Sequence, residues 1–129
     1  MSTIQVTNIQ DTSGGNSLTT AQNYNGTAKA WVNYDGITPA IRTSFNVSSV
    51  TRNATGDYTV AFTSAFSDTN YCIVHGLSGA SGSYLDYGNI LFDTPNGVYT
   101  APLAGSFRTT TYGQSAFRNP NALFFAIYR

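Results

Sequence analysis

Hydrophobic and polar positions alternate along short runs of this chain, and turn-forming residues separate the runs. In residues 57–62 every second side chain is aromatic or aliphatic. A period of two places such side chains on one face of a strand, where they can be buried. A second run at residues 48–52 is joined to the first by the turn cluster at residues 53–56, so the pattern predicts a β-hairpin. The side chains expected to point into a core are Tyr58, Val60 and Phe62.

Similar runs continue through the rest of the chain, with turn signals at a spacing of roughly 8–12 residues that is typical of a β-sandwich or barrel. No segment shows helical periodicity over a helix-like length. In residues 122–129 both faces are apolar, which indicates a central strand or one covered by a partner. The other expected strands are residues 29–34, 41–47, 71–77, 87–93, 98–103 and 106–112.

The first 27 residues follow a different pattern. Ile4 and Val6 alternate with polar residues over residues 3–9, which predicts one short strand that ends at Ile9. A Gly-containing turn cluster and a polar, weakly patterned stretch follow it. A lone strand cannot bury itself and needs a sheet to join, in its own chain or in a neighbour. We therefore expect residues 1–27 to form an arm and linker, residues 28–129 to form one β-domain, and Ile4, Val6 and Ile9 to be anchoring positions.

Composition supports an all-β chain. Charged residues make up 9% of the sequence, against about 25% in an average protein, and Thr, Ser, Asn and Gly take their place. The formal net charge is zero and no basic cluster exists, which argues against binding to nucleic acid or to an anionic membrane. No apolar stretch is long enough for a membrane span, and no signal peptide is visible. With so few charges, the protein is expected to hide much of its surface in an oligomer.

Few residues suit catalysis or metal binding. Cys72 and His75 are the sole cysteine and histidine, and their spacing on one strand places them on opposite faces. We expect a buried cysteine and a histidine at a strand end, and neither zinc nor calcium fits the available ligands. A pair of carboxylates for glycoside hydrolysis stays open as an alternative, because such pairs form across a fold. We expect no enzyme, no cofactor and no metal, with the sole tryptophan, Trp31, in the core.

The best candidate for surface recognition lies in residues 78–99. Flat aromatic faces combined with a carboxylate suit contact with a sugar or a protein. The alternative is that these tyrosines pack across strands, where tyrosine is common. The four candidate residues are Tyr84, Asp86, Tyr87 and Tyr99.

One block of sequence resembles a known module. Residues 29–75 contain KAWVNY, AIRTSFNVSSV, GDYTV and NY in this order. This block is similar to a module of marine bacteriophage structural proteins that are often described as tail-fibre-like. Residues 2–15, STIQVTNIQDTSGG, resemble the opening of the same proteins. The resemblance covers the chain as far as Gly76.

The resemblance implies a non-enzymatic protein that is made in the bacterial cytoplasm and exposed on the virion surface as a homotrimer. We expect a jelly-roll-like β-sandwich body whose extended N-terminal arm anchors it to capsid or tail proteins or ties the subunits together. The sequence contains no shaft, so a capsid decoration (cement) protein or a short head fibre is an alternative to a tail fibre. A second alternative is a carbohydrate-binding adhesin that contacts a host surface glycan.

Overall fold

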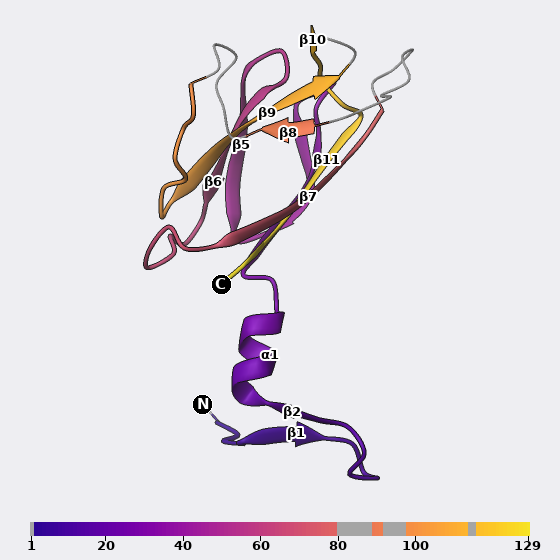
Figure 1. Ribbon diagram of the computed structural model, residues 1–129, viewed down its shortest axis with the longest axis vertical. Helices are drawn as coiled ribbons and strands as arrows, with labels where there is room; N and C mark the ends of the chain where they lie inside the picture. Colours follow the sequence, from indigo (N-terminus) through magenta and orange to yellow (C-terminus); the bar gives the residue numbers. More distant parts are fainter. Residues whose placement is uncertain (1, 80–88, 92–97, 114–115) are drawn as a thin grey trace.

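The computed structural model describes residues 2–79, 89–91, 98–113 and 116–129 (Figure 1). Most of these residues lie in antiparallel sheets, which confirms the prediction of an all-β chain. In chain order the elements are β1 (Asn8–Gln10), β2 (Ser17–Thr19), α1 (Thr20–Gly26), β3 (Ala30–Asp35), β4 (Ala40–Phe45), β5 (Val47–Ala54), β6 (Asp57–Phe62), β7 (Cys72–Ser78), β8 (Asn89–Leu91), β9 (Ser106–Gly113), β10 (Ala116–Phe117) and β11 (Ala122–Tyr128).

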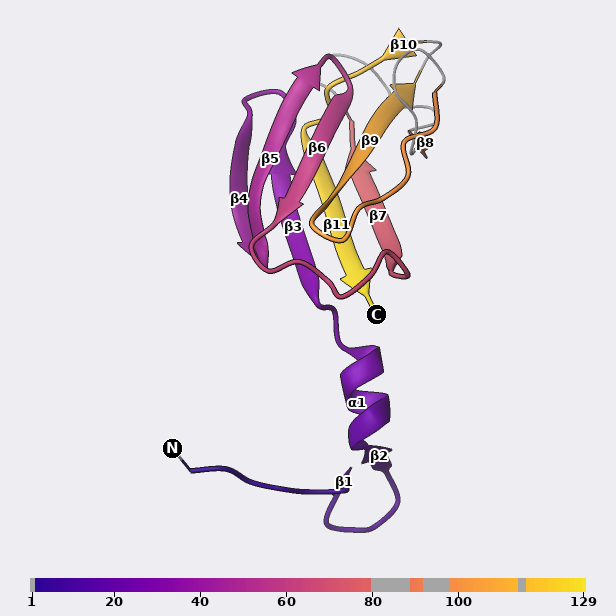
Figure 2. The same ribbon diagram turned by 90° about the vertical axis from the view of Figure 1, so that its left-hand side faces the viewer.

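Two antiparallel sheets lie face to face and form the body (Figure 2). The first sheet has the strand order β4-β3-β11-β7. The second has the order β10-β9-β6-β5, and β8 also pairs with β9. The last strand, β11, lies between β3 and β7, as its two apolar faces predicted. Pairing of the first body strand with the last one closes the body.

The core lies between the two sheets and is built from alternate positions of the strands. Two aromatic pairs bridge the sheets edge to face, with ring centroids 5.8 Å apart for Tyr34 and Tyr58 and 5.2 Å apart for Phe107 and Phe125. This geometry is favourable because a positive ring edge meets a negative ring face. The core side chains of β6 are those predicted, Tyr58, Val60 and Phe62. Strands β3 and β11 contribute Ala30, Val32, Leu123 and Ile127.

Trp31 does not lie in this core. Its neighbours Ala30 and Val32 point inward, so Trp31 points away from the second sheet and is 37% exposed. The prediction of a core tryptophan is therefore wrong. Alternation correctly separates the two faces of β3, but the inward face is the one with Ala30, Val32 and Tyr34.

A corner at Asn46 moves the chain from the first sheet to the second. Residues 41–47 were predicted as one strand, but β4 ends at Phe45 and Asn46 has a φ of 52°. Asparagine adopts this left-handed conformation more readily than most residues. Its side-chain amide donates to the carbonyls of Lys29 and Ser64, each at 3.2 Å, and its Oδ1 accepts from the Ser64 N–H at 2.8 Å. Asn46 thus holds three segments at the corner.

Two further strand predictions differ from the structure. The described part of residues 98–103 contains no strand, and Leu103 forms only an isolated bridge with Ser106. A two-residue strand, β10, pairs with the end of β9 and was not predicted. Both differences concern segments whose hydrogen bonds are set by tertiary contacts more than by local pattern.

Residues 2–27 project from one end of the body, and we call them the N-terminal stalk (Figures 1 and 2). The strand predicted over residues 3–9 is wrong in extent, since only Asn8 and Ile9 of that range lie in β1. β1 pairs with β2, and α1 follows directly, so the prediction of an unpatterned linker at residues 17–27 is also wrong. The missed signal is a capping box: the Gln22 N–H donates to Thr19 Oγ1 at 3.1 Å, and the Thr19 N–H donates to Gln22 Oε1 at 2.9 Å.

We expect Gly56→Ala to lower the free energy of unfolding by about 2–4 kcal/mol. Gly56 has a φ of 68°, and an added Cβ would lie 2.6 Å from the Thr111 carbonyl oxygen and 2.8 Å from the Arg118 nitrogen. Denaturant titration measures the loss. Gly26→Ala is the control, because nothing lies within 4 Å of its added Cβ, and equal effects of the two changes would contradict the prediction.

Candidate functional site

The predicted recognition residues are only partly described. Tyr84, Asp86 and Tyr87 lie outside the described residues. Tyr99 is described and is 65% exposed. Its exposure makes it available for contact, but the four residues cannot be placed together as one site.

Cys72 and His75 lie on opposite faces of β7, as predicted. Cys72 pairs with Tyr128 on the outer side of the first sheet, whereas His75 pairs with the inward-facing Phe125. The two side chains therefore do not form a thiol–imidazole pair. Cys72 is exposed, so the prediction of a buried cysteine is wrong. The reason is that β7 is an edge strand and Cys72 points away from the core.

Each described aspartate accepts hydrogen bonds from donor groups, and no two of them form a carboxylate pair. Asp11 accepts from the Asn16 amide, the Ser13 hydroxyl and the Gly15 N–H within a turn of the stalk. Three others form ion pairs with arginines, as expected for Asp and Arg across strands, and Asp86 and Asp93 lie outside the described residues. No cluster of His, Cys and Asp in the described ranges could hold a metal ion. The ion pairs are Asp35–Arg42 at 2.8 Å, Asp57–Arg108 at 2.5 Å and Asp68–Arg129 at 2.6 Å.

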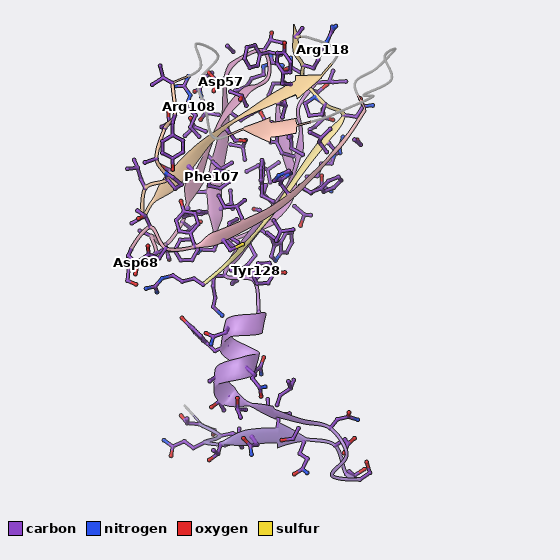
Figure 3. All side chains as sticks on the ribbon, in the orientation of Figure 1. Asp57, Asp68, Phe107, Arg108, Arg118 and Tyr128 are labelled. Carbon is purple, nitrogen blue, oxygen red and sulfur yellow. The ribbon has the colours of Figure 1, made fainter. Side chains whose placement is uncertain are left out.

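Asp57 differs from the other two because it is almost fully buried. Arg108 donates from Nε to Oδ1 at 2.9 Å and from Nη2 to Oδ2 at 2.5 Å, and the Asn53 amide adds a bond at 3.2 Å (Figure 3). The bonds from Arg108 lower the pKa of Asp57, although burial opposes them. Asp57 thus joins β6 to β9 by a charge-assisted, two-point contact.

The N-terminal stalk exposes apolar side chains along its whole length. Ile4 is 88% exposed, Val6 and Ile9 are also exposed, and α1 buries no residue. The predicted anchoring residues are therefore accessible. A seven-residue helix is shorter than the roughly 12–15 residues that a free helix needs, and a two-stranded hairpin is marginal by itself. The other exposed apolar residues of the stalk are Leu18 and Tyr24.

A compact junction joins the stalk to the body. The Lys29 N–H donates to the Ile127 carbonyl at 2.7 Å, which ties the chain to the last strand. The Lys29 ammonium donates to the Tyr24 carbonyl and lies 3.7 Å from the centroid of the Tyr24 ring. This cation–π contact joins the end of α1 to Lys29, the residue directly before β3. The junction thus joins the stalk to both the first and the last strand of the body.

Comparisons with other proteins give no relative. No protein-family model, curated protein or solved structure matches this chain. The part of the chain that the structure describes contains no helix with the length and hydropathy of a membrane span.

We expect Asp57→Asn to lower the free energy of unfolding by about 2–3 kcal/mol at pH 7, just below the range for fully buried pairs because Arg108 is partly hydrated. The folded pKa of Asp57 lies below 3.8, its ordinary value. The ion pair therefore contributes fully above about pH 4, and its contribution is lost as the pH falls through the folded pKa.

Denaturant titrations between pH 7 and pH 2 measure this difference. Plotted against pH, the free energies of unfolding of wild type and Asp57→Asn should converge at low pH. A constant separation would contradict a lowered pKa for Asp57. Asp68→Asn is the matched control, since Asp68 also forms a two-point contact with an arginine but is exposed. At pH 7, Asp68→Asn should lower the free energy of unfolding much less than Asp57→Asn does.

Proposed function

We propose that this chain is a non-enzymatic structural protein of a bacteriophage virion, exposed on the particle surface as a fibre-like homotrimer. The observation that carries the proposal is the N-terminal stalk, which projects from a β-body with its apolar side chains uncovered. The resemblance of residues 2–15 and 29–75 to tail-fibre-like phage proteins supports the same function. In this proposal the stalk attaches the protein to the capsid or tail, and the body faces outward.

The stalk is suited to attachment because its elements need contacts that the described chain does not provide. Residues 2–6 lie outside the hairpin, and their backbone donors and acceptors are available to a neighbouring sheet, whereas the Thr7 carbonyl already accepts from the Thr20 N–H at 3.0 Å. Added strands bind through main-chain hydrogen bonds, while alternate side chains fill pockets of the partner. Ile4 and Val6 stand at such alternate positions.

The body is proposed to be jelly-roll-like and without catalytic activity. Pairing of β3 with β11 and of β6 with β9 joins strands that are distant in sequence, as long Greek-key connections do. Absence of catalysis is proposed because Asp35, Asp57 and Asp68 are each bound to an arginine. An acid held in such a pair has a lowered pKa, which is unsuited to a general acid.

A capsid decoration protein is the second candidate. Its support is the size of the described part, which consists of one β-body and a short stalk with no shaft between them. A host adhesin is favoured only by the exposed Tyr99. Copy number separates the first two, because a decoration protein matches the number of capsomers and a tail fibre occupies a few positions. Specific retention on host glycans would favour the adhesin.

Replacing Ile4 and Val6 together with serine is expected to reduce incorporation into virions on the order of 100-fold, since burial of each side chain contributes about 1.5–3 kcal/mol. Quantitative immunoblotting of purified particles measures the loss. The midpoint of thermal unfolding of the free protein should not change, because neither residue contacts the core.

The matched control replaces Thr3 and Thr7 with serine in the same exposed segment. This control should be incorporated normally. Normal incorporation of the Ile4/Val6 variant would refute the anchoring role of these residues.

A further inference from the structure

The outer faces of the two sheets differ in chemistry. An antiparallel sheet with one face in water normally alternates apolar inside and polar outside. Most described outward positions of the second sheet follow this rule, such as Ser49, Thr51, Thr59 and Arg108. Its aromatic exceptions, Tyr112 and Phe117, pack against each other at the end of β9. The first sheet, β4-β3-β11-β7, breaks the rule, because large apolar side chains point outward from several of its strands.

These side chains form one continuous row across the first sheet. Phe45 pairs with Trp31, Trp31 with Ala126, and Ala126 with Val74, so the row crosses all four strands. Phe45 is 55% exposed and Val74 is 54% exposed. Phe124, on the same face of β11, is 42% exposed. We call Phe45, Trp31, Ala126 and Val74 the apolar row.

Ion pairs lie near both ends of the strands that form this face. Asp35 and Arg42 pair at the turn between β3 and β4, and Asp68 and Arg129 pair where β11 ends. The ends therefore hold the charges, and the apolar row lies between them, next to the outward-facing pair of Asn33 and Thr43. An apolar patch with a polar rim is the usual organisation of a protein–protein interface.

The apolar row is continuous with the stalk. β3 contributes Trp31, and it is the strand that the stalk enters directly (Figure 2). A copy of the chain packed on the row would therefore bring its own stalk next to this one. Both stalks could then cover the exposed Leu18 and Tyr24.

The exposed area is sufficient for such an interface. The chain exposes 7769 Å², whereas a compact protein of its mass is expected to expose about 6,600 Å². The excess of roughly 1,100 Å² is larger than the roughly 800 Å² that each partner contributes to a standard interface. The projecting stalk and the open face together can thus supply one full interface.

We propose that the outer face of the first sheet is the subunit interface, where a second copy of this chain packs on the apolar row. Repetition of this contact around an axis along the stalks closes the homotrimer of the proposed function, on which this inference rests. The partner is a copy of the chain because side-by-side packing on the row also covers Leu18 and Tyr24 of the adjoining stalk, while Ile4 and Val6 at its start remain exposed for attachment to the virion.

Cys72 provides a test in the unmodified protein. It is exposed, it is the sole cysteine, and it lies on the outer face beside the row. Sedimentation velocity gives the mass, and reaction with a thiol reagent gives the accessibility of Cys72. If the face is the interface, the thiol in the trimer should react about tenfold or more slowly than in protein diluted to monomer, because it reacts mainly when the contact opens.

A charge placed in the row tests the same contact by mutation. Val74→Glu should raise the dissociation constant on the order of 100-fold, since the contact would bury an unpaired carboxylate. Thr51→Glu is the matched control, an exposed outward position on the edge strand β5 of the other sheet, and it should keep the wild-type mass. Circular dichroism confirms that both variants retain the β-fold.

The outcomes distinguish this inference from the proposed function. A trimer with protected Cys72 that Val74→Glu dissociates supports the interface. A trimer that Val74→Glu leaves intact, with Cys72 reacting as fast as in monomer, overturns the interface and leaves the trimeric function standing. A wild-type protein that is monomeric at all concentrations overturns both.

Discussion

The pairing of β3 with β11 is the contact on which the rest of the structure depends. It joins the first and last strands of the body in one register, in which Val32 lies opposite Phe125 and Trp31 opposite Ala126. The first pair faces the core and the second faces away from it. The Lys29 N–H continues the ladder by donating to the Ile127 carbonyl. Because this ladder ends at the junction, the stalk and the C-terminus lie at the same end of the body (Figure 1).

The paired central strands β3 and β11 carry apolar side chains on both faces. The core between the sheets can cover only one of these faces. The second sheet covers the inner face through Tyr58, Val60 and Phe107. The outer face of the second sheet is mostly polar. The outer face of the first sheet has no such cover within the described chain, and neither does the stalk. Side chains uncovered in water gain no burial energy, so selection for solubility alone would favour polar residues in their place. Their presence on two connected surfaces is explained if a second copy covers the row and the virion covers the start of the stalk.

Alternation predicted most of the body strands, and it indicated the buried face of β6 but not that of β3. The hairpin of β5 and β6 and the central position of β11 were predictable because their patterns are local. The pattern of β3 cannot show which face enters the core, so Trp31 was assigned wrongly. α1 has only seven residues, too few for periodicity, and only its capping box could have indicated it. The ion pair of Asp57 and Arg108 joins residues far apart in sequence, which no local pattern records.

The scarcity of charge links these observations to assembly. Of the four aspartates in the described ranges, three are bound to arginines, and Lys29 is held at the Tyr24 ring. These pairs fasten strands and the stalk junction, so they add little free charge to the surface. A monomer with neutral net charge, few free ions and an uncovered apolar row would associate in water. In the proposed homotrimer each subunit would cover the row and the adjoining stalk of a neighbour, and a contact whose rotation closes on itself would give one defined oligomer instead of an open filament.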